Sequence, residues 1–115
     1  MDIIFADRKI KKCANDDRLA LREFGKIRFE IFKKRMTALY VADNLEELRH
    51  QPGNWHELTG NRKGQWACDL DQPYRLVFEP QEKPIPNDDS GKFIWIEIKA
   101  VEIIEITNYH IPSSV

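Results

Sequence analysis

Apolar residues recur along this chain with two different periods, and the period changes near residue 54. Between residues 18 and 42 the spacing is that of one face of a helix. The apolar stripe of this predicted long helix consists of Ala20, Phe24, Ile27, Ile31 and Ala38. Gly25 lies inside the same segment, where it predicts a weak point or a bend. A shorter helix is predicted over residues 8–14, because Asp7 can cap its first turn.

From residue 54 onward the pattern is typical of strands. Three short apolar runs cover residues 54–59, 65–70 and 74–79. The turn sequences "GNRKG" and "DQP" separate them, so we expect a hairpin followed by a third strand. Before these strands, "NLEELRHQPG" resembles a capping box followed by one or two helical turns.

The last β-type run covers residues 93–107 and alternates between apolar and polar positions. Its parity slips near Ala100 and again between Ile103 and Ile104, and a flat strand cannot place both sets of apolar residues on the same face. We therefore expect a bulge or break near residues 99–100, with a last strand at roughly 101–107. The run "DIIFA" at residues 2–6 is also β-type and needs a partner in the same sheet.

Helices first and strands afterwards predict an α+β fold in one domain over residues 1–115. We expect the N-terminal strand and two helices to pack on one face of a small antiparallel sheet. Residues 80–92 hold three prolines and are predicted to form an exposed loop, and residues 111–115 a tail. The uncovered face of such a sheet is the natural place for a functional site.

Composition narrows the classes of function. The chain has 115 residues, is 42% hydrophobic and 32% charged, and carries a net charge of −1. This net charge argues against nucleic-acid binding through overall charge alone and leaves room for a local basic patch. No apolar run approaches the roughly 18 residues of a membrane span, and the first residues do not form a signal peptide. We expect a cytoplasmic protein with two reduced cysteines.

Two histidines are candidates for proton transfer, because histidine titrates near neutral pH. His56 lies in the first strand of the β part and His110 follows the last strand. The structural alternative is that His56 packs beside a tryptophan and His110 belongs to the tail. Spacing alone favours this alternative for each of them.

Arg75 is unusual because it lies between apolar residues of a strand. It either pairs with Glu79 on the same face or holds a phosphate with its planar guanidinium. Tyr109 is either a core edge or a stacking surface for a base. Arg62 and Lys63 lie in the hairpin loop "GNRKG", which is either a solvated tip or a phosphate-contacting loop.

Other sites are missing from the sequence. It has no glycine-rich nucleotide-binding loop and no string of zinc ligands. Cys68 lies in the middle of a predicted strand, which favours a packing role over a nucleophilic one.

The stretch "WHELTGNRKGQWACDLDQPYRLVFE", together with the terminal "EIIEITNYH", resembles the HigB-type toxins, also called plasmid-maintenance killer proteins, of the RelE/ParE superfamily. The resemblance covers roughly residues 54–79 and 101–110. It implies a compact RelE-like α+β domain. It also implies a ribosome-dependent endoribonuclease that cuts messenger RNA at the A site without a metal or other cofactor. A cognate helix-turn-helix antitoxin would neutralise it. The toxin would exist as a monomer or in a toxin–antitoxin hetero-oligomer.

The resemblance also implies roles for individual residues. His56 would act as base or acid, Arg75 would steady the phosphate, and the pair Tyr109 and His110 would orient the nucleotide and assist proton transfer. Metal-free cleavage uses the ribose 2′-hydroxyl as the nucleophile. It needs a base to take the hydroxyl proton, a cation to balance the charge of the phosphate, and an acid to protonate the leaving oxygen. The RNA backbone contacts would come from Arg62 and Lys63.

Two positions depart from the family pattern. Thr59 stands where the family has a lysine, and Asn108 where it has an aspartate. These changes favour an alternative in which a catalytically weak or inactive member of the fold acts by binding an antitoxin or another protein. A further alternative is a gyrase-directed toxin, which needs no RNA chemistry.

Overall fold

The computed structural model describes residues 1–108 as an α+β domain. Its regular elements are β1 (Asp2–Phe5), α1 (Arg8–Asn15), α2 (Asp17–Val41), β2 (His56–Glu57), β3 (Trp66–Asp69), β4 (Tyr74–Pro80) and β5 (Ala100–Asn108). Three short 3-10 helices connect them: η1 (Glu46–His50), η2 (Gly60–Arg62) and η3 (Trp95–Glu97). No helix among these residues is long and apolar enough to cross a lipid bilayer.

The five strands form one sheet in the order β1-β5-β4-β3-β2. The predicted α+β class is confirmed, but the sheet is mixed rather than antiparallel. β1 pairs with β5 in parallel, whereas the other neighbours are antiparallel. The reason is topological: the chain leaves β1 for the helices and returns to it by a long crossover, which brings the two strands into the same direction.

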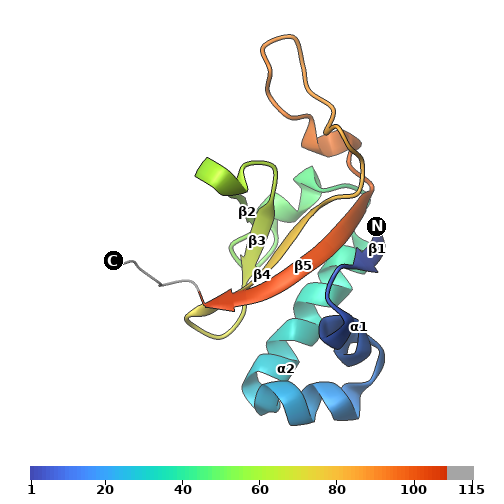
Figure 1. The fold of residues 1–115 in the computed structure, drawn as a ribbon, viewed down its shortest axis with the longest axis vertical. Coiled ribbons are helices and arrows are strands. Elements are labelled where there is room, and N and C mark those ends of the chain that lie inside the picture. Colours follow the sequence, from blue (N-terminus) through green and yellow to red (C-terminus); the bar gives the residue numbers. More distant parts are fainter. Residues whose placement is uncertain (109–115) are drawn as a thin grey trace.

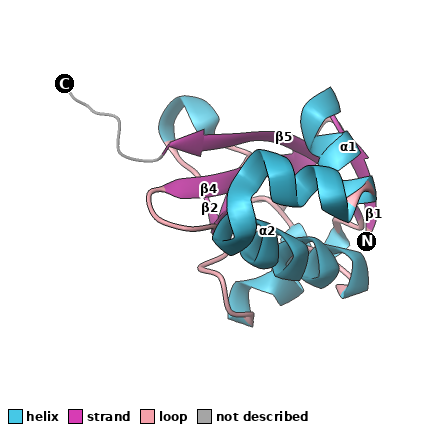
Figure 2. Cartoon of the chain, turned by 90° about the horizontal axis from the view of Figure 1, so that it is seen from below, coloured by secondary structure: helices cyan, strands magenta, loops and turns pink. Residues whose placement is uncertain are grey.

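Both helices are capped at their N-termini by an aspartate and contribute to the core beneath one face of the sheet (Figure 2). The Asp7 side chain accepts a hydrogen bond from the Ile10 amide at 2.8 Å, as predicted, and Asp16 accepts one from the Leu19 amide at 3.2 Å. The main apolar core joins α2 to this face of the sheet. It includes Phe32, Met36, Leu39, Leu48, Leu76, Phe78, Val101 and Ile103.

Gly25 divides α2 into two segments. Its φ of 78° and ψ of 166° are non-helical and favour glycine, so the predicted bend is present. The bend also makes one part of the predicted apolar stripe wrong. Ile27 is 69% exposed, because the helical phase set by Ala20 does not continue through Gly25.

The segment 93–107 contains one strand, not two. Residues 95–97 form η3 where the alternating pattern predicted strand, because Trp95 turns inward to pack edge-on against Trp66, with ring centroids 5.5 Å apart. β5 then begins at Ala100, close to the predicted break. The bulge itself lies further along, where Val77 pairs with Glu105 but Phe78 pairs with Ile103. Ile104 is the extra residue, and it accounts for the second slip in parity.

Residues 81–99 leave the sheet between β4 and β5 and form the projection seen in orange at one end of the molecule (Figure 1). Residues 87–92 are exposed, and a single bridge joins Asn87 to Phe93. The Asp88 carboxylate holds the tip by accepting hydrogen bonds from the Ser90 and Lys92 amides at 2.9 and 3.0 Å.

Candidate functional site

The face of the sheet away from the main core carries two cross-strand rows of side chains. In antiparallel pairs, residues directly opposite each other point to the same face. The register places His56 opposite Ala67, Ala67 opposite Val77, and Val77 opposite Glu105. The neighbouring row consists of Asp69, Arg75 and Thr107. In the first row, the polar side chains of His56 and Glu105 therefore flank Ala67 and Val77, which form a low apolar floor.

This floor is a small core of its own. Ala67 and Val77 are fully buried, and Leu58 is 8% exposed; Ile104, the bulged residue of β5, packs against them. The bulge thus supplies an apolar contact and still lets Glu105 face the same side.

A shallow hollow of about 380 Å³ opens above one end of the floor, and we call it the sheet pocket. Three residues predicted to belong to a functional site, His56, Arg62 and Arg75, all line it. The rest of its lining is Glu57, Leu58, Thr59 and Asn61. The pocket is small, polar and rich in cations, which suits an anionic group better than an apolar ligand.

His56 is held in one orientation and one tautomer. Its Nδ1 lies 2.7 Å from the backbone oxygen of Asn54, which can only accept a hydrogen bond. Nδ1 therefore carries the hydrogen, and in the neutral ring Nε2 carries the lone pair. The ring is half-buried and lines the pocket, so it is not sealed from solvent. This arrangement leaves Nε2 able to accept a proton.

Arg62 reaches across the floor and is anchored by two partners. It donates to the Gln65 side chain at 2.8 Å and forms an ion pair with Glu105 of β5. Gln65 in turn donates to Glu79 at 3.0 Å, and Glu79 accepts from Lys83 at 2.7 Å. Burial raises the pKa of Glu79, but its bonds to Lys83 and Gln65 outweigh this effect and lower it. Glu79 therefore completes the chain as a carboxylate.

The tight turn between β2 and β3 decides which loop cation enters the pocket. The Arg62 amide donates to the Thr59 oxygen and the Lys63 amide to the Gly60 oxygen, both at 3.1 Å. Gly60 has a φ of 64°, which favours glycine. This turn sends Arg62 into the pocket and Lys63 to the other side, where its Nζ lies 5.7 Å from the centroid of the Phe93 ring. Lys63 therefore does not line the sheet pocket.

Two of the predicted site residues, Tyr109 and His110, lie outside the described residues. β5 leads toward them: Thr107 is opposite Arg75, and Asn108 is opposite Tyr74. Asn54 and Glu105 were not predicted, although both contact predicted site residues. The only sequence signal for Glu105 was an acid placed among the isoleucines of a strand.

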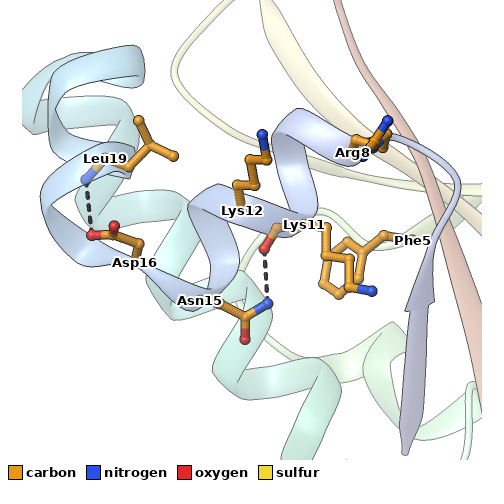
Figure 3. Close-up of a pocket in the computed structure, with 7 residues that line it drawn as sticks. All are labelled: Phe5, Arg8, Lys11, Lys12, Asn15, Asp16 and Leu19. Carbon is orange, nitrogen blue, oxygen red and sulfur yellow. Dashed lines mark hydrogen bonds between the residues drawn. The ribbon is translucent and has the colours of Figure 1, made fainter.

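A second hollow, of about 580 Å³, follows α1, and we call it the α1 groove. Figure 3 shows Arg8, Lys11 and Lys12 along the helix, with Phe5 toward one end and Leu19 toward the other. Lys11 and Lys12 follow Arg8 by three and four residues, so each lies about one helical turn from Arg8. All three are exposed, and none makes an ion pair with a described residue.

Neither metal-ligand nor thiol chemistry is suggested by the arrangement of side chains. Within residues 1–108, no group of three or more His, Cys, Asp or Glu side chains is placed to hold a metal ion. Cys13 and Cys68 are free thiols, both buried. Burial raises the pKa of the Cys68 thiol, which agrees with a packing role.

Comparisons with known proteins identify the fold. No protein-family model and no curated protein matches the chain. Among solved structures, it is similar to a YoeB/ParE toxin from Agrobacterium tumefaciens, with a TM-score of 0.50 and 12% identity. The similarity covers 96% of this chain and all of the other. At this identity the match establishes a RelE/YoeB-like toxin fold; the HigB-type subfamily stays a prediction.

Proposed function

We propose that this protein is the toxin of a type II toxin–antitoxin system and cuts messenger RNA in the ribosomal A site. The observation that carries the proposal is the sheet pocket, where His56, Arg62 and Arg75 meet on the open face. The toxin fold of the neighbouring structure agrees with it. A pocket with two guanidinium groups and an oriented imidazole suits a phosphodiester better than a neutral ligand.

The proposed reaction begins at the ribose 2′-hydroxyl. His56 takes its proton through Nε2, which the Nδ1 bond to Asn54 keeps as the acceptor in the neutral ring. The 2′-oxygen then forms a bond to phosphorus while the bond to the 5′-oxygen breaks. The products are a 2′,3′-cyclic phosphate and a 5′-hydroxyl, and the leaving oxygen takes up one proton.

Arg75 and Arg62 stabilise the negative charge that develops on the phosphate oxygens. Arg62 is held in place by Gln65 and Glu105, so its position costs little reorganisation when the phosphate arrives. We assign proton delivery to the leaving oxygen to His110 and nucleotide orientation to Tyr109. Thr59, at the rim of the pocket, supplies a hydroxyl but no charge.

A second candidate function is binding without RNA chemistry. The α1 groove favours it, because three exposed bases between the apolar side chains of Phe5 and Leu19 fit an acidic amphipathic segment of a protein. In the toxin proposal the same groove receives part of the cognate antitoxin. The two candidates therefore differ only in whether the sheet pocket is catalytic.

The deciding experiment is cleavage mapping of a messenger during in vitro translation. The proteins to compare are the wild type, His56→Ala, Tyr109→Phe and the matched control His50→Ala, since His50 is exposed on η1 away from the pocket. We expect cuts only when ribosomes are present. The rate should fall by about 100-fold or more in His56→Ala and be unchanged in His50→Ala. An intact messenger with the wild type during continuing translation would leave the binding function as the better account.

A further inference from the structure

A third hollow lies beside the sheet pocket, on the other side of the β2–β3 hairpin. It has a volume of about 520 Å³, and we call it the aromatic hollow. Glu57 lines both hollows, so they adjoin at the edge strand β2. The consecutive residues Arg62 and Lys63 enter one hollow each. A polymer that leaves the sheet pocket around this edge therefore meets the aromatic hollow next.

Two aromatic rings, Phe93 and Trp95, line the hollow, and Trp66 supports them from the core. Trp66 packs edge-on against Trp95, and Trp95 packs edge-on against Phe93, with centroids 5.5 and 5.1 Å apart. Trp66 and Trp95 are buried, whereas Phe93 is only half-buried. Phe93 is thus the ring that a planar ligand can reach, on a support too well packed to move away.

The acidic side chains around the hollow are paired, whereas its lysines form no ion pair with a described residue. Both of its carboxylates are held by Arg49, which contacts Glu46 at 2.8 Å and Glu57 at 2.9 Å. Lys63 and Lys92 are exposed, and neither forms an ion pair within the described part of the chain. The acidic groups are therefore satisfied internally, while positive charge near Phe93 remains available to an anion.

From this geometry we infer that the aromatic hollow binds a nucleotide that flanks the cleaved bond of the RNA. Its base stacks on Phe93, and its phosphate lies between Lys63 and Lys92. An aromatic face beside free cations is the combination that holds single-stranded nucleic acid without reading its sequence. The inference rests on the proposed function, since it extends the path of an RNA bound in the sheet pocket.

The test uses ribosomes programmed with messengers that the toxin cannot cut, because the reactive ribose carries a 2′-O-methyl group. One messenger extends on both sides of the target bond, and two others are truncated next to it, one on each side. Affinity of labelled toxin is measured for the wild type, Phe93→Leu, the double variant Lys63→Gln/Lys92→Gln, and the control Lys34→Gln on α2. Leucine keeps an apolar contact with Trp95, and circular dichroism checks that each variant is folded.

We expect the wild type and Lys34→Gln to lose about 10-fold in affinity on one of the two truncated messengers, because one stacked base and its phosphate contacts are removed. Phe93→Leu and the double lysine variant should bind the long messenger about 10-fold more weakly than the wild type does. Truncation of the messenger should then lower their affinity only slightly further. Equal losses on truncation in wild type and variants would overturn the inference. So would full messenger affinity with loss of antitoxin binding, which would assign the hollow to a protein.

The result also separates the two proposals. A wild-type protein that cuts the unmodified messenger but shows no dependence on its length leaves the proposed function in place and removes the flanking subsite. A wild-type protein that neither cuts nor binds programmed ribosomes overturns both.

Discussion

The sheet pocket and the α1 groove both gather positive charge, but they hold it in different ways. In the sheet pocket, Arg62 is fixed by Gln65 and Glu105, and the His56 ring is fixed by the Asn54 oxygen. In the α1 groove, Arg8, Lys11 and Lys12 project from one helix, exposed and without an acidic partner among residues 1–108.

This difference indicates that the sheet pocket and the α1 groove have different functions. Groups fixed before the ligand arrives are what a reaction needs, since their orientation is settled in advance. Exposed, flexible cations beside apolar side chains instead raise the rate of encounter with an acidic macromolecule and adapt to its surface. We therefore expect substitutions in the two places to affect different measurements.

The largest expected effect comes from Arg75. Arg75→Gln should reduce ribosome-dependent cleavage by about 100-fold or more, because the proposed reaction then loses a charge that stabilises the phosphate in the transition state. Arg75→Lys should restore only part of the rate, since an ammonium group lacks the planar fork of a guanidinium. Both rates come from the in vitro translation assay, with thermal unfolding as the control for folding. A Lys variant as fast as the wild type would mean that Arg75 serves as a point charge only.

A middle-sized effect is expected in the α1 groove. Lys11→Gln/Lys12→Gln should slow association with the proposed cognate antitoxin by about 10-fold at low salt, because electrostatic steering weakens. Messenger cleavage by the same variant should not change. Surface plasmon resonance at several salt concentrations measures the rates, with Lys9→Gln as the matched control. Lys9 lies on the same helix but is paired with Glu23 at 2.8 Å. A fall in cleavage without any change in association would reverse the assignment of the two regions.

The elements of the helical half could be predicted because their signals are local. Asp7 caps α1 and Gly25 bends α2, and each acts within one turn of its own position. The parallel pairing of β1 with β5 could not be predicted, since it depends on the path of the whole chain. The same holds for η3, where packing of Trp95 against Trp66 overrides a local strand preference.

In the candidate site, too, local sequence signals do not determine which side chains meet. His56 and Arg75 share the pocket because strand register brings them to one face. Arg62 and Lys63 looked equivalent in the loop sequence, yet the turn at η2 separates them into two hollows. Glu105 faces the pocket side only because of the bulge at Ile104, which depends on the pairing of β4 with β5.

The smallest expected effect concerns the turn that supports the sheet pocket. Arg28 of α2 forms two hydrogen bonds with Asp71, at 2.7 and 3.2 Å, and its guanidinium lies 3.8 Å from the centroid of the Tyr74 ring. These contacts fix the turn that leads into β4, and hence the position of Arg75. Asp71→Asn should lower the free energy of unfolding by about 1–2 kcal/mol at pH 7, after allowance for partial exposure. Cleavage should fall only a few-fold, and antitoxin association should not change.

The pH dependence of this effect follows from the ion pair. The hydrogen bonds from Arg28 lower the pKa of Asp71 below its ordinary value of 3.8. A carboxyl group with a lowered pKa in the folded state contributes stability that is fully present above its unfolded pKa and is lost as the pH falls through the folded pKa. Urea unfolding should therefore show the full difference between wild type and Asp71→Asn at neutral pH, and a shrinking one below about pH 4. Asp89→Asn, at the exposed tip of the 81–99 projection, should unfold like the wild type at both pH values. A difference that stays constant into acid would mean that Asp71 acts through its shape and backbone contacts, and that the charge of Arg28 contributes nothing to the support of the pocket.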